Sequence, residues 1–284
     1  MTARVINGRE IAKRIRERVK ERVMELKEKH GIEPVMGTVI VGKNEESELY
    51  LRLRDKACTE CGIGVRHLRF DENAGENEVI EGIERLNNDD SVHGIMLQQP
   101  LPSHMRVQRL IEKIDVRKDV EGLTSHNMGR LMFGDERIVP CTAKAVVKIL
   151  DHADVKLEGA DIVIVNHSPI VGKPLAIMML NRNATVSVCH VFTKNLKNYT
   201  KRADVLITAT GVSGLIREDS IKEGCIVIDV GISKSDGNVR GDVKFDEVKE
   251  KASIITPVPG GVGPVTIACA LENLVELCFM RVEG

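Results

Sequence analysis

Apolar side chains recur near the N-terminus at the spacing of a helix. They follow one another at steps of three or four residues with charged residues between them, and they are Ile11, Ile15, Val19, Val23 and Leu26. An α-helix makes one turn about every 3.6 residues, so this stripe predicts an amphipathic helix over residues 8–30. The interspersed charges distinguish the segment from the apolar core of a secretion signal.

Short apolar runs and longer amphipathic runs alternate along the rest of the chain. The short runs predict strands over residues 34–41, 65–70, 93–97, 162–165, 185–189, 205–208 and 226–230. The longer runs predict helices over residues 46–61, 79–86, 171–181 and 266–280. Continuous apolar strands that alternate with helices indicate a parallel sheet with both faces covered, so we expect an α/β protein.

The length of 284 residues is comfortable for two domains. Hydrophobic residues make up 42% and aromatic residues only 2%, so the cores must be built from aliphatic side chains. Turn-forming residues are frequent between residues 119 and 142, where we expect the domain boundary. We assign residues 1–139 and the C-terminal helix 267–284 to the first α/β domain, and residues 140–266 to a second, Rossmann-like domain with a parallel sheet.

Charge balance and cysteine usage restrict the partners and the compartment. Lys and Arg number 41 against 42 Asp and Glu, whereas nucleic-acid binding needs a concentrated cationic surface, so we expect no nucleic acid. No uninterrupted apolar run is long enough to span a membrane, so we expect no membrane partner. The cysteines number seven, and most lie in apolar runs, which is typical of reduced, buried thiols in a cytoplasmic protein. Cys58 and Cys61 form a lone C-x-x-C, and the histidines show no ligand-spaced cluster, so we expect no metal.

Residues 164–180 read as a strand, a polar turn and a helix, an arrangement that attracts phosphate. Ser168 can cap the helix or donate to an anion, and Gly172 allows close approach to the backbone. The G-x-G-x-x-G fingerprint is missing, so an ordinary strand–helix connection remains the alternative. The acid that often holds the ribose of NAD is absent from residues 184–194, which favours NADP.

Seven blocks of the sequence together carry a family resemblance. They are GKNEESELYLRLRDKAC (42–58), GIMLQQPLP (94–102), KDVEGL (118–123), VPCT (139–142), SPIVGKP (168–174), IDVGI (228–232) and TPVPGGVGPVT (256–266). In this order and spacing, over nearly the whole chain, they resemble the methylenetetrahydrofolate dehydrogenase/cyclohydrolase family. The resemblance implies two α/β domains that flank a cleft, with folate bound by the first domain and NAD(P) by the second, and a homodimer. It also implies oxidation of 5,10-methylenetetrahydrofolate to the 5,10-methenyl compound and hydrolysis of that product to 10-formyltetrahydrofolate.

The same resemblance implies roles for individual residues. Tyr50 would stack on the folate, and Gln98, next to Leu97 in the substrate site, would hydrogen-bond the reacting centre and orient the group at position 54. The folate side of the cleft would be lined by Pro257, Pro259, Gly260, Gly261 and Gly263. The nicotinamide cofactor would contact Asn166, His167, Ser168, Gly172, Val191 and Ile232. Ordinary structural explanations remain open, such as a core aromatic for Tyr50 or a tight turn for the glycines.

Two catalytic positions depart from the family pattern. The family has a lysine four residues after its tyrosine, and this chain has Arg54; Lys56 lies about 200° away around the helix and cannot simply replace it. The acidic partner, usually Asp, is Glu121. Hydride transfer mainly needs two aligned ligands, whereas hydrolysis needs proton transfer, for which arginine is poorly suited. We therefore predict that dehydrogenase activity survives while cyclohydrolase activity is weak or absent, the alternative being that Arg54 and Glu121 are a co-adjusted pair that does both.

The cofactor positions also depart from the pattern. The usual Gly-Arg-Ser is Asn166-His167-Ser168, and the usual Ser-Lys is Val191-Phe192. Both changes remove phosphate-binding groups and favour NAD, whereas the missing acid favours NADP. We expect NADP, as is usual in the family, with NAD as the alternative.

Three alternatives to a bifunctional enzyme stay open at this point. The chain could be a dehydrogenase-only family member, or a non-catalytic folate- or nucleotide-binding homologue that has lost the lysine. It could also be a dehydrogenase of the same architecture acting on another substrate, such as an amino acid, although Tyr50, Gln98 and the Pro/Gly-rich segment argue against this.

Overall fold

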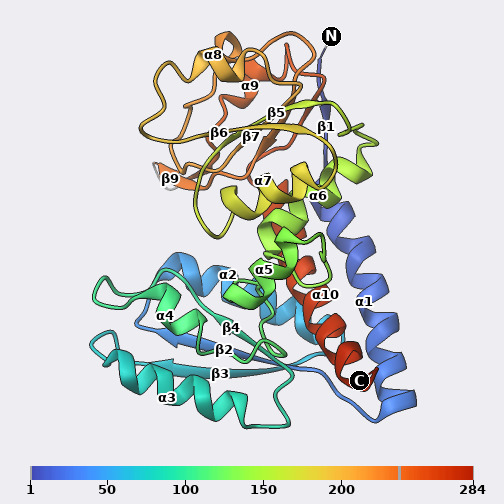
Figure 1. Ribbon diagram of the computed structural model, residues 1–284, viewed down its shortest axis with the longest axis vertical. Coiled ribbons are helices and arrows are strands. Elements are labelled where there is room, and N and C mark those ends of the chain that lie inside the picture. The colour runs from blue at the N-terminus through green and yellow to red at the C-terminus, as the bar shows by residue number, and fades with distance from the viewer. Residues whose placement is uncertain (1, 236–237, 284) are drawn as a thin grey trace. The chain divides into compact units, whose positions relative to one another are not determined.

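The chain alternates strands and helices over residues 2–235 and 238–283, which are the residues described by the computed structural model (Figure 1). It divides into two compact units. Lys13–Val139 and Ile267–Gly284 form one, with a three-stranded sheet, and Met1–Ala12 and Pro140–Thr266 form the other, with a six-stranded sheet. We refer to them as the three-stranded unit and the six-stranded unit.

The three-stranded unit is built on a parallel sheet with strand order β3-β2-β4. Strand β2 (Val35–Val41) is almost entirely buried because it lies between β3 (Gly64–Phe70) and β4 (Gly94–Leu97). Helix α2 (Glu45–Glu60) follows β2, and α3 (Glu76–Asn87) follows β3. Two short helices, α4 (Val107–Ile111) and α5 (Ser125–Met132), follow β4, and the Thr124 hydroxyl accepts a hydrogen bond from Asn127 N as the cap of α5.

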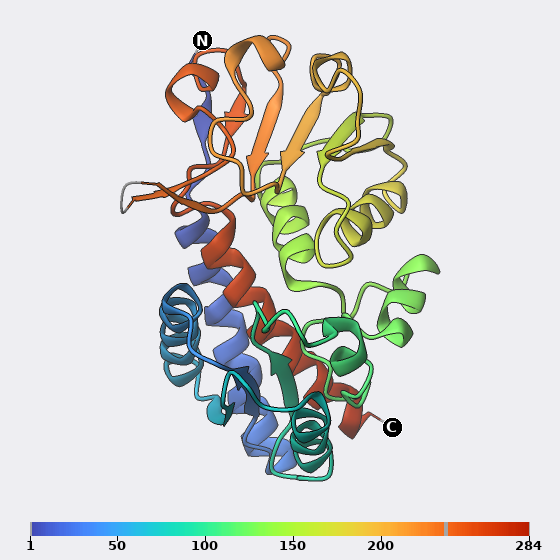
Figure 2. The ribbon, with the colours of Figure 1, turned by 90° about the vertical axis from the view of Figure 1, so that its left-hand side faces the viewer.

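Two long helices, α1 (Gly8–His30) and α10 (Val262–Val282), run side by side in both ribbon views (Figure 2). Arg22 of α1 joins them, since its guanidinium lies 2.9 Å from the Glu276 carboxylate and 4.4 Å from the centre of the Phe279 ring. The stripe of apolar residues predicted for α1 is buried. Helix α10 is apolar on most of its surface, and it begins four residues earlier than predicted because Gly263 and Pro264 fit within its first turn.

Helix α10 is long and apolar enough, by length and composition alone, to cross a membrane. However, 72% of its most apolar stretch is buried inside the protein. It packs so closely on β4 that a Cβ atom added at Gly94 would lie 2.5 Å from Leu274 Cδ1. These contacts are those of a core helix.

The six-stranded unit contains a parallel sheet with strand order β1-β11-β8-β7-β5-β6. The strands are β1 (Arg4–Val5), β5 (Asp161–Val165), β6 (Thr185–Cys189), β7 (Val205–Thr208), β8 (Ile226–Asp229) and β11 (Ile254–Ile255). Its helices are α6 (Cys141–His152), α7 (Gly172–Leu180), α8 (Lys197–Thr200) and α9 (Phe245–Val248), with a 3-10 turn at Glu218–Ser220. Strands β9 (Ser233–Ser235) and β10 (Asn238–Arg240) form a separate antiparallel pair.

The α/β class and the parallel sheets predicted from the sequence are confirmed. The predicted domain limits differ from the structure at the N-terminus, because β1 pairs with β11 and therefore joins the six-stranded unit. A two-residue strand carries no periodicity, so neither β1 nor β11 was predictable. All seven cysteines are buried, as predicted.

Candidate active site

Polar side chains of the three-stranded unit gather where the strand order of its sheet reverses. The chain passes from β2 to β3 on one side and then returns to β4 on the other, so the carboxyl ends of β2 and β4 lie next to each other. Gln98, directly after β4, donates its backbone N–H to Val39 O of β2. Such a reversal is where open α/β sheets bind ligands.

Arg54 lies on α2 one turn after Tyr50 and is completely buried. Its Nη2 donates to Thr38 Oγ1 at 2.8 Å, and its Nη1 contacts Met96 Sδ. Thr38 and Met96 are directly opposite each other on β2 and β4, so the guanidinium lies across the pair of strands. The side chain of Lys56 is 75% exposed and lies 3.9 Å from Glu60, so it points away from this cluster, as the helix geometry predicts.

Two buried polar atoms of this cluster have no protein partner among the described residues. They are Nε of Arg54 and Oε1 of Gln98, whose Nε2 donates to Gln99 O at 3.0 Å. Buried polar groups are nearly always hydrogen-bonded, so these two unsatisfied atoms mark the cluster as a candidate site for a polar ligand. Tyr50 is half-buried on the same helix as Arg54, whereas Leu97 is fully buried and contributes its backbone.

Glu121 accepts a hydrogen bond from the backbone N–H of Leu97 at 3.3 Å, which holds its carboxyl group at the end of β4. Burial, and then the nearby carboxylate of Asp119, raise the pKa of Glu121 to about 7, although the charge of Arg54 opposes the shift. A carboxyl group with such a pKa can exchange protons at neutral pH. Arg54 and Glu121 interact through their charges, but they make no ion pair within the described part of the chain.

Three residues of this cluster escaped the sequence analysis. Thr38 and Met96 hold Arg54, and Asp119 accepts hydrogen bonds from Leu123 N, Thr124 N and Asn127 Nδ2. A threonine within a fully buried strand was the available signal for Thr38, because a buried hydroxyl needs a partner. Nothing in the local sequence distinguishes Asp119 from an ordinary turn residue.

The strand order of the six-stranded sheet also reverses once, between β5 and β7. The predicted cofactor turn lies there, at the carboxyl ends of these two strands. Asn166 orders it, because its Oδ1 accepts hydrogen bonds from Ser168 N (2.8 Å) and Gly172 N (3.0 Å). Its Nδ2 donates to Ala209 O after β7 at 2.6 Å, which ties the two strand ends together. The Ser168 hydroxyl accepts from Val171 N and completes the turn.

Gly172 is the residue in this turn that no other amino acid can replace without a backbone shift. A Cβ atom there would lie 2.1 Å from Asn166 O, so the start of α7 approaches the end of β5 more closely than a side chain permits. The turn then presents backbone and the N-terminus of a nine-residue helix to its surroundings, as phosphate sites do. The residues present therefore fit a dinucleotide.

Other predicted cofactor residues surround the same strand ends. The rings of His167 and His190 are 4.8 Å apart, and His190 is followed by the exposed apolar side chains of Val191 (87%) and Phe192 (83%). Ile232, three residues beyond the end of β8 in sequence, is 61% exposed. Exposed apolar groups beside a polar turn suit a ligand with both aromatic rings and phosphates.

The predicted folate-lining segment, from Pro257 to Gly263, belongs to the six-stranded unit and leads into α10. Pro259 follows a cis peptide bond, and Gly260 has φ +104, which favours glycine. A Cβ atom at Gly261 would lie 2.5 Å from Pro257 O, so this turn is closed by its glycines. The contact of this segment with folate stays a prediction. In the described part of the chain, no three His, Cys, Asp or Glu side chains are placed to hold a metal ion.

Comparisons with known proteins cover nearly the whole chain. The catalytic domain of the tetrahydrofolate dehydrogenase/cyclohydrolase family matches residues 6–121, and the NAD(P)-binding domain of that family matches residues 140–281. A bifunctional protein FolD from Methanosarcina barkeri is 48% identical over 272 residues, which covers 96% of this chain and 95% of the relative.

Two solved structures have the same fold. The bifunctional enzyme FolD (methylenetetrahydrofolate dehydrogenase/cyclohydrolase) from Campylobacter jejuni has a TM-score of 0.95 at 46% identity, over 98% of this chain and 99% of that one. The N5,N10-methylenetetrahydrofolate dehydrogenase-cyclohydrolase from Trypanosoma brucei, solved with NADP and an inhibitor, has a TM-score of 0.96 at 35% identity and covers 100% of both chains.

Proposed function

Because the chain belongs to the tetrahydrofolate dehydrogenase/cyclohydrolase family, we propose that it oxidises 5,10-methylenetetrahydrofolate and hydrolyses the methenyl product to 10-formyltetrahydrofolate. The observation that carries the proposal is the polar cluster of Arg54, Gln98 and Glu121 at the carboxyl ends of β2 and β4. It offers a reduced pterin both hydrogen-bonding groups and a carboxyl group that exchanges protons at neutral pH.

The three-stranded unit binds and orients the folate. Tyr50 stacks on its ring system, and the unpaired Oε1 of Gln98 accepts a hydrogen bond from a ring N–H. Leu97 fixes the position of Glu121 through its backbone N–H. The family resemblance further implies that the Pro/Gly-rich segment of the six-stranded unit, with Pro257, Pro259, Gly260, Gly261 and Gly263, contacts the folate.

The six-stranded unit binds the cofactor, which is NADP, the cofactor bound to the Trypanosoma brucei relative. Asn166 holds the turn at Ser168 and Gly172 in shape for the phosphates, and His167, Val191 and Ile232 contact the rest of the molecule. When bound, NADP accepts the hydride that leaves the methylene carbon. The protein's part in this step is to align the two molecules and exclude water.

The hydrolytic step makes a different demand, because a water molecule must lose a proton as it attacks the methenyl carbon. Arg54 stays charged and cannot accept this proton. Glu121 can accept it, since its pKa is raised to about 7. The second reaction therefore depends on one titrating group, and we expect it to be slow compared with the first.

The test is an absorbance assay of purified protein with 5,10-methylenetetrahydrofolate and either NADP or NAD. We expect reduced nicotinamide to form, with the larger kcat/KM for NADP. Absence of reduced cofactor with both nucleotides would refute the proposed activity, and a larger kcat/KM for NAD would refute the proposed preference.

We also propose a homodimer in the cytoplasm. This rests on the family resemblance and, for the compartment, on seven buried cysteines without a disulfide among the described residues. Light scattering after size-exclusion chromatography tests the dimer, and a monomeric mass at micromolar concentration would contradict it.

A further inference from the structure

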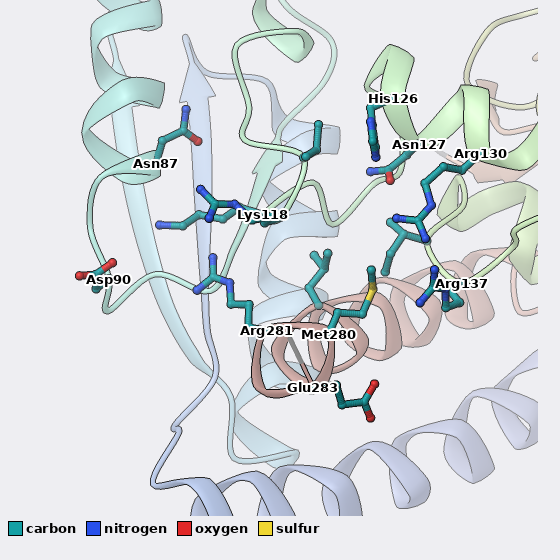
Figure 3. Close-up of a pocket in the computed structure, with 14 residues that line it drawn as sticks. Asn87, Asp90, Lys118, His126, Asn127, Arg130, Arg137, Met280, Arg281 and Glu283 are labelled. Atoms are coloured by element: carbon teal, nitrogen blue, oxygen red, sulfur yellow. The ribbon is translucent and has the colours of Figure 1, made fainter.

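A cavity of about 870 Å³ in the three-stranded unit lies outside the catalytic cluster (Figure 3). It is lined by residues after α3, by residues 116–118, by α5 and the segment that follows it, and by the end of α10. None of its lining residues is among those at the carboxyl ends of β2 and β4. Its volume is within the range of small-molecule sites.

The cavity wall is cationic. It contains five lysine or arginine side chains and two acidic ones, Asp90 and Glu283, and the cationic residues are Arg117, Lys118, Arg130, Arg137 and Arg281. Figure 3 shows the guanidinium group of Arg281 directed toward Lys118, whereas the Glu283 carboxylate points away from it.

Acidic residues outside the wall neutralise only part of this charge. Arg117 is paired with Asp115 at 2.6 Å. Arg130 and Arg137 share one ion-pair partner, the carboxylate of Asp135, while Glu276 and Glu283 act on Arg137 only through their charges, without an ion pair. Two cations thus have a single carboxylate within ion-pair distance.

Lys118 and Arg281 form no ion pair within the described chain, although Asp115 acts on both through its charge and Asp89 and Asp90 act on Lys118. Lys118 as a whole is only 4% exposed, and its ammonium donates to two backbone carbonyls, Leu86 O at 2.9 Å and Asp89 O at 2.8 Å. Burial, and then the charge of Arg281, lower the pKa of Lys118. Arg281 makes no side-chain hydrogen bond or ion pair with the described residues, so its guanidinium fork is available.

We propose that this cavity binds a small polyanion, that is, a molecule with two or more phosphate or carboxylate groups. Arginine side chains bind such groups through paired, charge-assisted hydrogen bonds. One anionic group lies against Arg281, next to the buried charge of Lys118, and another against Arg130 and Arg137, so the ligand offsets the excess positive charge of the wall. The site is separate from the proposed folate and cofactor sites, and its failure would leave the proposed function intact.

The test is isothermal titration calorimetry of the full chain with inorganic pyrophosphate, and in separate arms with citrate and with triglutamate. Wild-type protein is compared with Arg281→Gln and with Arg137→Gln. Arg14→Gln is the matched control, because Arg14 is an exposed arginine of α1 that does not line the cavity. Loss of a charge-assisted hydrogen bond should weaken binding about tenfold to hundredfold in the two cavity variants, and added salt should weaken it in the wild type.

Each outcome decides the proposal. Binding of pyrophosphate alone identifies a phosphorylated ligand, and binding of citrate or triglutamate alone identifies a carboxylate ligand. Equal affinity in wild type and both cavity variants would overturn the proposal, since it would mean that the probe binds elsewhere, for example at the cofactor turn. Failure of all three probes to bind would overturn it too. Arg137→Gln keeps the test valid if Arg281→Gln does not fold. The Arg137 side chain is 53% exposed, and Asp135 retains its ion pair with Arg130 in that variant.

Discussion

Replacing Arg54 by lysine exchanges a group that stays charged for one whose pKa burial can lower. Arg54 is completely buried, with Nη2 bonded to Thr38 and Nη1 against Met96, and Nε without a protein partner. A lysine ammonium is compact and carries three donors, so it can keep the Thr38 bond while it loses the contact with Met96. In this environment burial lowers the pKa of a lysine, which makes its proton available.

The structure sets the size of the two expected effects. General acid–base catalysis contributes about 10²–10⁴-fold to a rate, and Glu121 already supplies part of it, so we expect Arg54→Lys to raise methenyl hydrolysis by roughly 10- to 100-fold. Dehydrogenation depends on alignment and should change by less than about threefold. Loss of one charge-assisted hydrogen bond should lower the free energy of unfolding by about 1.5–3 kcal/mol.

The assay follows the decay of the methenyl compound and the formation of NADPH separately, with wild-type protein, Arg54→Lys and Arg52→Lys. Arg52 lies on the same helix and is exposed, so Arg52→Lys is the matched control for the same chemical change. The reasoning is refuted if wild-type protein hydrolyses the methenyl compound as fast as it dehydrogenates the methylene compound. It is also refuted if Arg54→Lys leaves hydrolysis unchanged while the protein remains folded.

Three further substitutions test the structure. The pKa of Glu121 is raised from 4.5 to about 7, so the stability that this group contributes is greatest below pH 4.5 and is lost as the pH rises through about 7. Glu121→Gln should abolish this loss, which is worth about 3 kcal/mol. If the free energies of unfolding in urea of wild type and variant changed equally between pH 4.5 and pH 7, this prediction would be contradicted. Gly172→Ala adds a Cβ atom 2.1 Å from Asn166 O and should raise the KM for NADP more than about tenfold. Gly129→Ala is the control, because its added Cβ meets no atom within 4 Å. An unchanged KM for the Gly172 variant would argue against the proposed cofactor turn. Gly94→Ala places a Cβ atom 2.3 Å from Val120 Cγ2 and 2.5 Å from Leu274 Cδ1, so we expect a loss of about 1–3 kcal/mol in thermal unfolding, and an unchanged melting temperature would show that α10 packs less tightly than described.

The sequence was sufficient for the fold wherever the apolar pattern is long enough to have a period. The helix of residues 8–30 and the seven predicted strands are confirmed, and most of them bury a stripe or a run of apolar residues. An exception is β3, which is mostly exposed and is held by its pairing with β2. Short strands such as β11 are defined only by their pairing with neighbouring strands in the sheet, so the local sequence does not predict them. The early start of α10 was hidden by a glycine and a proline, which usually mark a turn.

The candidate site was predictable as a set of residues but not as a set of contacts. The structure agrees with the prediction that Lys56 points away from Arg54, because helix geometry alone determines it. The support of Arg54 by Thr38 and Met96 depends on the register of two strands that are 58 residues apart in sequence, which no local pattern specifies. The cationic cavity combines side chains from four separate segments of the chain, so no single sequence motif predicts it.

The position of α10 in the chain bears on the order in which the protein folds during synthesis. Residues 13–139 leave the ribosome first, but the strip of sheet around Gly94 stays uncovered until residues 267–282 have been made. Residues 140–266, which complete the six-stranded unit begun by residues 1–12, emerge in between, and until residue 267 the three-stranded unit keeps an open apolar surface. Nascent chains stalled before residue 267 should therefore recruit chaperones, and those stalled beyond residue 282 should release them.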